Sequence, residues 1–243
     1  MWRPTSLTPE FYLMPHTTKD LFQTELDLLK GRSRHPHLHQ LLPFLKKGDT
    51  VLDLGCGLLV NSLYLKDNGF KPVGMDISIQ MLQEGENIDI PSCCGDGLML
   101  PFKPKSFGGL LLIDIIEHLP RGKVDEFIRE AKRVLKNDAV IFLHVPLEKS
   151  LSYRLLNMRG IIWPKNPNHQ HDYTLKEITS LIKEMRCKVL WEHKENGFVY
   201  SLRNHLKEIK FLVVLSSFLG KYAENIFTAA YTACLSFELD IHK

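Results

Sequence analysis

Val51-Leu52-Asp53-Leu54-Gly55-Cys56-Gly57 is the stretch of this 243-residue chain that decides its fold. The apolar residues around a single acid predict a buried strand covered on both faces, as in a parallel sheet. Two glycines one residue apart predict a tight turn in which the backbone approaches a ligand closely. An acid directly before that turn would repel a phosphate, so it suits a ligand with a cationic amine.

Strand and helix patterns alternate along most of the sequence, with short connections between them. This alternation predicts an α/β fold with a doubly wound, mostly parallel seven-stranded sheet whose last strand is antiparallel. The predicted strands cover residues 51–54, 72–75, 88–94, 110–116, 140–145, 189–191 and 233–241. The predicted helices cover residues 18–29, 38–45, 60–65, 79–83 and 124–135, and a further helix begins at residue 174.

The pattern also predicts how the chain is divided. Residues 1–47 are expected to form an N-terminal helical cap, and residues 48–243 the main domain. Within that domain, an apolar helical insert is expected at about 202–231, before the last strand. The insert is interpreted either as a helical hairpin buried on the sheet or as a hydrophobic lid for a lipid-like or aromatic acceptor. Such a lid could also contact a membrane surface peripherally.

Bulk composition narrows the functional class. A net charge of +3 without a dense run of Lys or Arg makes a nucleic-acid partner unlikely on sequence grounds. Five cysteines without recurring spacing do not predict a disulfide framework, which favours a reducing cytoplasm. The sequence has neither a signal-peptide pattern nor an apolar run of the ~20 residues that a membrane span needs. His35, His37 and His39 are interpreted as a solvated or helix-capping cluster.

Three acids fall at the ends of successive predicted strands: Asp53, Asp76 and Asp96. Asp76 follows the glycine turn by about 20 residues, where a carboxylate accepts hydrogen bonds from both hydroxyls of a ribose. A dinucleotide enzyme would share that feature. However, Leu58, Leu59 and Val60 follow Gly57, so the third glycine of G-x-G-x-x-G is absent, and Asp53 would repel a pyrophosphate.

The order of five motifs resembles the class I S-adenosylmethionine-dependent methyltransferases, which have a Rossmann-like fold. The resemblance is strongest to the branch that contains the ubiquinone and other small-molecule O- and C-methyltransferases, and it covers roughly residues 48–191. The motifs are Val51 to Gly57; Val73-Gly74-Met75-Asp76-Ile77-Ser78; Gly95-Asp96-Gly97 with Leu100-Pro101-Phe102; Ile116-Glu117-His118-Leu119; and Glu130 to Lys136.

The resemblance implies S-adenosylmethionine as the cofactor and assigns residues to its methionine end. Gly55 and Gly57 would let the turn pack against the methionine part. Asp53 would face the α-amino group, directly or through water. Ile113 and Asp114 would border the methionine and the transferred methyl group.

The resemblance also assigns residues to the adenosine end. Asp76 would bind the two ribose hydroxyls, and Ile77 would lie against the adenine face. Asp96 would accept from the adenine exocyclic amine, and the N–H of Gly97 would meet a ring nitrogen. Two of these residues have structural alternatives: Asp76 as a helix cap, and Asp96 as a turn residue between two glycines.

His118 is the predicted catalytic residue, because an imidazole titrates near neutral pH and suits a base for an oxygen nucleophile. Its alternative role is to satisfy backbone groups near a helix start. No metal is predicted. Nevertheless, Asp114, Glu117, His118 and the distant His169 resemble the E-x-x-E-H and distant His set of metal-assisted methyltransferases. In such a site Asp114 would be one methylene shorter than the family glutamate.

The sequence therefore predicts an S-adenosylmethionine-dependent methyltransferase that acts on a small, apolar or aromatic acceptor. One alternative is a non-catalytic cofactor-binding or partner-binding module of the same fold. It is motivated by Leu59, which stands where the family usually has a small residue. Another is a metal-assisted RNA 2′-O-methyltransferase, motivated by Glu117, His118 and His169.

Overall fold

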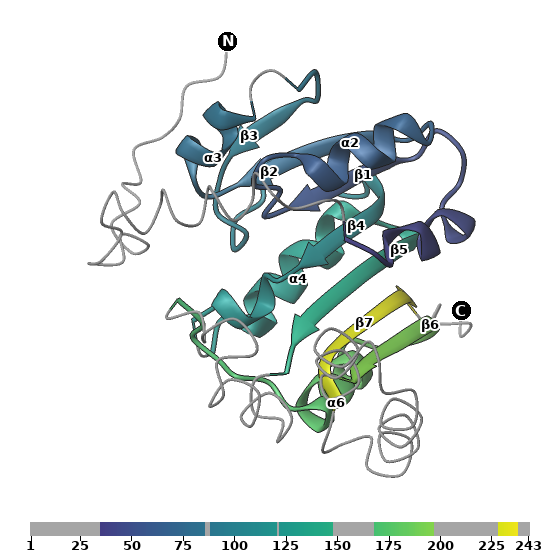
Figure 1. Cartoon of the computed structure of the whole chain (residues 1–243), viewed down its shortest axis with the longest axis vertical. Coiled ribbons are helices and arrows are strands. Elements are labelled where there is room, and N and C mark those ends of the chain that lie inside the picture. The colour runs from purple at the N-terminus through teal and green to yellow at the C-terminus, as the bar shows by residue number, and fades with distance from the viewer. Residues whose placement is uncertain (1–34, 86–87, 121, 148–167, 197–227, 238–243) are drawn as a thin grey trace, which may run out of the picture. The chain divides into compact units, whose positions relative to one another are not determined.

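The computed structural model describes residues 35–85, 88–120, 122–147, 168–196 and 228–237 (Figure 1). The chain divides into two compact units, Met1–Ser33 and Arg34–Lys243, and all described residues belong to the second. The predicted helix over residues 18–29 and residues 202–227 of the predicted insert lie outside the described residues.

A seven-stranded sheet with the strand order β3-β2-β1-β4-β5-β7-β6 forms the centre of the second unit. Strands β1 to β5 pair in parallel, and β7 lies antiparallel between β5 and β6, so the predicted fold is confirmed. The elements are η1 (Leu38–Gln40), η2 (Leu42–Phe44), β1 (Thr50–Leu54), α2 (Val60–Asp67), β2 (Lys71–Asp76), α3 (Ile79–Glu84), β3 (Ser92–Cys94), β4 (Phe107–Ile113), η3 (Ile116–His118), α4 (Val124–Val134), β5 (Leu135–Pro146), α6 (Leu175–Glu184), β6 (Cys187–Asn196) and β7 (Thr228–Phe237).

Each face of the sheet is covered by its own apolar cluster. On one face, α4 and α6 pack on the central strands, with buried side chains such as Phe127 and Ile178. On the other face, η1, η2 and α2 pack on the same strands through Leu38, Leu41 and Leu65. The helices have these faces because their apolar residues recur every three or four positions. Burial on both faces explains why the central strands are continuous apolar runs.

Several predicted boundaries are corrected by the structure. The predicted helix over 38–45 is two 3₁₀ turns, η1 and η2, because Pro43 lacks an N–H and interrupts a continuous helix. The third strand is limited to Ser92–Cys94, directly after Pro91. The predicted strand over 110–116 is displaced toward the N-terminus: β4 begins at Phe107 and ends at Ile113.

The last strand is displaced in the same direction. β7 begins at Thr228 and ends at Phe237, whereas the sequence predicts a strand over 233–241. Residues 228–231, assigned to the apolar insert, are therefore strand residues that pair with β5 and β6. The predicted boundary at residue 47 stays a prediction, although Leu38 and Leu41 pack on the same sheet as the strands that follow.

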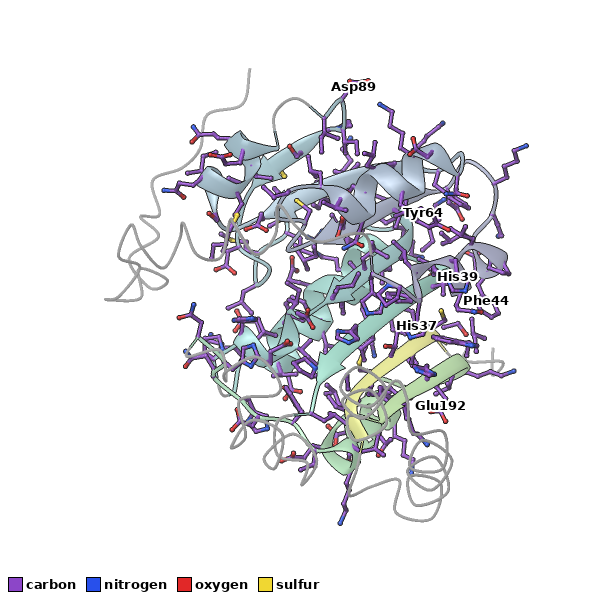
Figure 2. The ribbon with its side chains drawn as sticks, in the orientation of Figure 1. His37, His39, Phe44, Tyr64, Asp89 and Glu192 are labelled. Atoms are coloured by element: carbon purple, nitrogen blue, oxygen red, sulfur yellow. The ribbon has the colours of Figure 1, made fainter. Side chains whose placement is uncertain are left out.

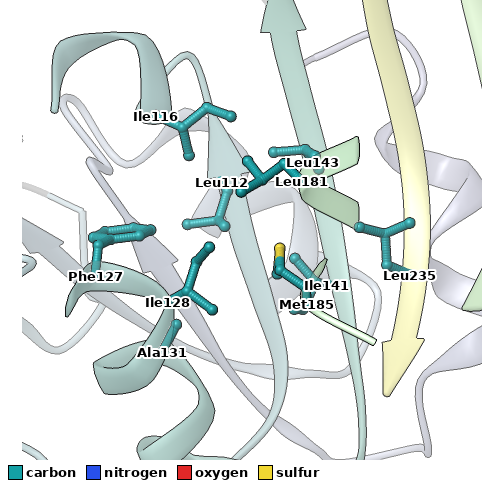
Figure 3. Close-up of a pocket in the computed structure, with 10 residues that line it drawn as sticks. All are labelled: Leu112, Ile116, Phe127, Ile128, Ala131, Ile141, Leu143, Leu181, Met185 and Leu235. Carbon is teal, nitrogen blue, oxygen red and sulfur yellow. The ribbon is translucent and has the colours of Figure 1, made fainter. Parts of the chain in front are cut away.

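A small apolar pocket lies between the sheet, α4 and α6 (Figure 3). Every side chain that lines it is apolar, and Figure 3 shows them converging from both helices and from β4, β5 and β7. Because no lining side chain bears a polar group, this pocket belongs to the packing of the core. It offers no chemistry for a reaction.

Two further expectations concern covalent and membrane structure. All five cysteines are free thiols, as expected from their irregular spacing. No helix among the described residues has the length and apolar character that crossing a membrane requires.

Candidate functional site

The candidate site lies at the carboxyl edge of the sheet, where β1, β2, β3 and β4 end side by side (Figure 1). The chain proceeds from β1 to β2 and β3 on one side, and β4 pairs with β1 on the other. Such a reversal of strand order opens a crevice at the carboxyl ends of the strands. Asp53 and Asp76 lie in these strands, Asp114 directly follows β4, and Asp96 lies two residues after β3, so the topology brings the predicted acids to one edge.

The glycine loop between β1 and α2 is held tightly against β2. Gly55 has a φ of 72° and donates its N–H to the Met75 carbonyl over 2.7 Å. A Cβ added at Gly55 would stand 2.0 Å from Ile115 Cδ1, and the left-handed φ would strain any other residue, so both observations favour glycine there. Gly57 has a φ of 48° and donates its N–H to Asp76 Oδ2 over 2.8 Å. The loop is thus joined to the predicted ribose-binding acid.

Leu59 does not obstruct this loop. Its backbone is left-handed, with a φ of 61°, and its side chain is buried in a cluster with Cys56, Leu82 and Ile90. The loop thus accommodates a leucine at this position by directing its side chain into the core. The left-handed backbone costs conformational energy in a non-glycine residue, and the burial of the leucine side chain offsets that cost.

Asp53 is a buried acid under the glycine loop, with 2% of its surface exposed. Ser62 in α2 donates its hydroxyl to Asp53 Oδ2 over 2.6 Å. Burial raises the pKa of Asp53 to about 6; the bond from Ser62 opposes this shift and the charge of Asp76 adds to it. Its predicted approach to an α-amino group stays a prediction. A cationic ligand nearby would stabilise the charged form.

Asp76 ends β2 and connects two loops. Its Oδ2 accepts from Gly57 and its Oδ1 from the N–H of Ser78, each over 2.8 Å. Burial raises the pKa of Asp76, while the backbone N–H donors act in the opposite direction. The alternative role as a helix cap falls to Ser78, whose hydroxyl accepts from the N–H of Met81 at the start of α3. Ile77 is a large apolar residue with half of its surface exposed beside this acid.

Asp96 and Gly97 follow β3. Asp96 Oδ1 accepts from the N–H of Leu98 over 2.8 Å, so the acid stabilises its own turn as its structural alternative foresaw. Gly97 lies against α4: a Cβ added there would stand 2.9 Å from the Phe127 ring. The roles of Asp96 and Gly97 toward adenine stay predictions. They are compatible with this turn, because the second carboxylate oxygen of Asp96 can still accept a hydrogen bond from another donor.

Asp114 lies directly after β4 and has a left-handed backbone, with a φ of 55°. Its N–H donates to the His144 carbonyl over 3.2 Å, and its Oδ1 lies 2.7 Å from His144 Nδ1. Ile113, the other residue predicted to border the transferred methyl group, pairs in register with His144 on β5. The predicted methyl-transfer position is therefore adjacent to an aspartate–histidine pair.

The predicted catalytic residue His118 belongs to a second cluster, at η3. Ligand atoms of Glu117, His118 and His169 all lie within 4.8 Å of one another, and this group could hold a metal ion. The imidazoles of His118 and His169 are edge to face, with ring centres 4.7 Å apart. The Glu117 carbonyl accepts from the N–H groups of Gln170 and His171, which keeps the distant segment beside η3. Asp114 is not part of this group.

Sequence analysis did not identify His144, and its interpretation of His35, His37 and His39 as a solvated or helix-capping cluster is correct only in part. His37 is the N-cap residue of η1. The signal for His144 is a polar residue inside the apolar run Ile141-Phe142-Leu143-His144-Val145. Of the three histidines interpreted as solvated or capping, only His39 is exposed. The His35 ring lies over His144, with centres 4.5 Å apart, and His37 lies over His193 at 4.3 Å.

The chain resembles known methyltransferases over the part that contains this site. A family model described as a methyltransferase domain matches residues 52–143. Demethylmenaquinone methyltransferase of Corynebacterium urealyticum is 36% identical over 92 residues, which are 38% of this chain and 39% of that protein. The 2-methyl-6-phytyl-1,4-hydroquinone methyltransferase of Synechocystis sp. is 30% identical over 133 residues, which are 52% of this chain and 40% of that protein. The matched stretch thus covers about two fifths of these relatives.

Solved structures show the same fold. A SAM dependent methyltransferase from Archaeoglobus fulgidus superposes with a TM-score of 0.60 at 18% identity, covering 89% of this chain and 98% of that one. At this identity the likeness concerns the fold alone. It agrees with the strand order and the antiparallel β7 described above.

Proposed function

We propose that this chain, whose residues 52–143 are a methyltransferase domain of the class I S-adenosylmethionine-dependent type, methylates a small apolar or aromatic acceptor of the quinol or phenol kind. The observation that supports this proposal best is the acidic edge of the sheet beside a glycine loop whose Gly57 N–H donates to Asp76. The names of the two relatives, both methyltransferases of quinone-type molecules, support the acceptor class.

The residues at the carboxyl edge suit S-adenosylmethionine. When bound, this cofactor supplies a methyl group on a positively charged sulfur, which is intrinsically reactive toward nucleophiles. Asp53 and Asp76 provide negative potential for the charged amino and sulfonium groups. Asp76 would accept from the ribose hydroxyls, and the exposed Ile77 would cover the adenine ring. These residues bind and orient the cofactor so that an acceptor can approach the methyl group in line.

Binding and transfer can be tested separately. Calorimetry with S-adenosylhomocysteine measures cofactor binding, and labelled S-adenosylmethionine measures transfer to hydroquinone, naphthoquinol and a short RNA. We expect S-adenosylhomocysteine to bind and label to appear in the aromatic acceptors but not in RNA. Absence of binding would refute the proposal. Binding without transfer to any acceptor would favour the non-catalytic module that Leu59 motivates.

A metal-assisted reaction is a second candidate, favoured by the gathering of Glu117, His118 and His169. A carboxylate and two imidazoles could hold a divalent cation, which would orient a vicinal diol or a catechol. Transfer to a catechol that stops in EDTA and returns with Mg²⁺ or Mn²⁺ would establish this mechanism. Undiminished turnover in EDTA would leave His118 as the predicted metal-free base.

We also propose a cytoplasmic location, as the irregular cysteine spacing suggests. A peripheral membrane contact through the apolar insert is a separate proposal, and residues 202–227 lie outside the described part of the chain. An apolar acceptor would make such a contact useful. Co-sedimentation of the whole protein with lipid vesicles tests it, and absence from the vesicle pellet would contradict it.

A further inference from the structure

A row of polar side chains crosses the sheet beside the methyl-transfer position. His144 on β5, Thr232 on β7 and His193 on β6 are cross-strand partners, so their side chains lie on one face. The neighbouring row on that face, Phe142–Cys234–Trp191, belongs to the apolar cluster. Burying polar side chains beside an apolar cluster costs stability unless they form hydrogen bonds. A polar row that ends at the carboxyl edge of the sheet therefore suggests a functional role.

The chain before η1 covers this row with two further imidazoles. The His35 ring contacts His144 and Phe142, and His37 contacts His193 and Trp191. Figure 2 shows His37 beside strands β6 and β7. The His35 N–H donates to Asn61 Oδ1 in α2 over 2.8 Å, which links this covering segment to the helix that follows the glycine loop.

Asp114 brings a carboxylate to the His144 end of this row. Burial lowers the pKa of His35 to about 3, and the neighbouring His144 adds to this shift, so His35 stays neutral in the physiological range. Among the residues that the structure describes, the titratable groups near His144 are Asp114 beyond β4, His35 and His37 before η1, and His193 across the row. Only Asp114 among them provides a negative charge, at 2.7 Å from His144 Nδ1.

The pair lies where a reacting group would be. His144 has 12% of its side chain exposed and Asp114 has 38%. Both lie at the carboxyl edge, next to Ile113, and the left-handed backbone of Asp114 is a strained conformation. Strain in a non-glycine residue persists where surrounding contacts hold it, and it is concentrated at functional sites. Here the two bonds from Asp114 to His144 hold it.

We propose that His144, oriented by Asp114, binds the ionisable hydroxyl of a phenolic or enolic acceptor and accepts its proton. This inference rests on the proposed function. It gives the role of base, predicted above for His118, to His144 instead, because His118 lies in the separate cluster with Glu117 and His169. With Nδ1 directed at Asp114, the proton leaves the acceptor oxygen and bonds to Nε2, which gives an imidazolium beside a carboxylate. The electron pair left on oxygen forms the new bond to the methyl carbon, and the carbon–sulfur bond breaks with its electrons on sulfur, giving neutral S-adenosylhomocysteine.

The test follows the ionisation of a bound phenol, so it does not require turnover. para-Nitrophenol is titrated by absorbance on the whole protein, in EDTA, with and without S-adenosylhomocysteine. We expect the pKa of the bound phenol to be about one unit lower than that of the free phenol. At a pH well below both pKa values, the ionised fraction of the bound phenol is then about tenfold larger. His144→Asn should abolish this shift, because its amide can replace Nδ1 toward Asp114 but not Nε2. Asp114→Asn should reduce it.

His193→Asn is the matched control, since it removes an imidazole from the same row two strands away. The phenol bound to this variant should ionise at the same pH as the phenol bound to the wild type. The proposal is overturned if the wild type does not bind the phenol, if bound and free phenol titrate alike, or if His144→Asn retains the shift. Thermal unfolding shows whether each variant folds; should His144→Asn not fold, the Asp114→Asn result decides. Failure of the protein to bind S-adenosylhomocysteine would refute the proposed function but not the role of His144. The phenol titration in the absence of S-adenosylhomocysteine tests that role separately.

Discussion

The side chain of Leu59 fills the space beside Gly74: a Cβ added at Gly74 would stand 2.4 Å from Leu59 Cδ2 and 2.9 Å from Cys56 Sγ. Leu59 is the N-cap residue directly before α2, and Gly74 lies within β2. The absence of a side chain on β2 therefore accommodates the leucine under the glycine loop. The two positions are complementary, which explains how a large residue is tolerated there.

Gly74→Ala should destabilise the protein by about 1–3 kcal/mol through overpacking. Leu59→Ala alone should cost about 2–5 kcal/mol because it leaves a cavity. The double variant should cost less than the sum by about 1 kcal/mol or more, since the alanine at 74 then occupies vacated space. Urea unfolding measures all three. Gly85→Ala is the control, because its Cβ would meet Leu59 at an ordinary 3.5 Å; strictly additive costs would contradict the coupling.

Asp53→Asn should stabilise the protein relative to the wild type at neutral pH. The folded-state pKa of about 6 is higher than the ordinary 3.8, so the folded protein disfavours the charged carboxylate. The resulting penalty is nearly absent below pH 3.8, develops as the pH rises, and is complete above pH 6. The stability difference between variant and wild type should thus grow by about 2 kcal/mol from pH 4 to pH 7.

Denaturant unfolding at both pH values checks this expectation for Asp53. The exposed Asp125→Asn provides the comparison and should show a difference that changes little with pH. A difference for Asp53→Asn that is constant from pH 4 to pH 7 would show that the carboxylate is charged without penalty. The same variant should weaken binding of S-adenosylhomocysteine if Asp53 interacts with its amino group.

Asp76→Ala should lower the affinity for S-adenosylhomocysteine by about 10- to 100-fold, since it removes a charged acceptor whose hydrogen bonds are worth about 1.5–3 kcal/mol. It also removes the bonds from Gly57 and Ser78 that join the two loops. Asp76→Asn, which retains one acceptor oxygen, should lie between alanine and wild type in calorimetry. Asp67→Ala, an exposed acid at the end of α2, is the control; equal affinities for Asp76→Ala and this control would exclude Asp76 from the site.

Arg133→Lys should destabilise the protein by about 1–2 kcal/mol, because a lysine cannot reproduce the planar fork of the guanidinium. Arg133 donates to the Phe102 and Leu100 carbonyls and to Glu130, each over 2.8 Å. It thereby attaches the loop after β3 to α4. Thermal and urea unfolding measure the loss, and the exposed Arg129→Lys is the matched control. Indistinguishable stabilities of the two variants would show that this network contributes nothing.

The sequence predicts the acidic edge well because the relevant spacing is local. Asp53 and Asp76 interrupt or end short apolar runs, and parallel strands bring such positions to one edge. The end of β4 is less predictable. The apolar run from Leu110 to Ile116 continues through Asp114 into η3, and Ile116 is as buried as the strand residues. The apolar residues from 110 to 116 indicate which positions are buried. They do not indicate where the backbone leaves the strand conformation, which happens after Ile113.

Contacts between distant segments are the part that could not be predicted. Asp114 and His144 are 30 residues apart, and only the register of β4 against β5 makes them partners. His35 meets that pair because the segment before η1 crosses the sheet, and no local pattern specifies this crossing. Glu117 and His169 were recognisable only through a resemblance, since 52 positions separate them, and backbone bonds to Glu117 bring the distant segment close.

Two backbone N–H groups, from Gly57 and Ser78, donate to Asp76 and hold its carboxylate in one orientation without a ligand. Each carboxylate oxygen has a second lone pair with which it can accept a ribose hydroxyl. Little conformational entropy is therefore lost at this residue on binding, and the favourable contacts translate more fully into affinity. If the ribose binds to Asp76 as proposed, this residue is preorganised for it.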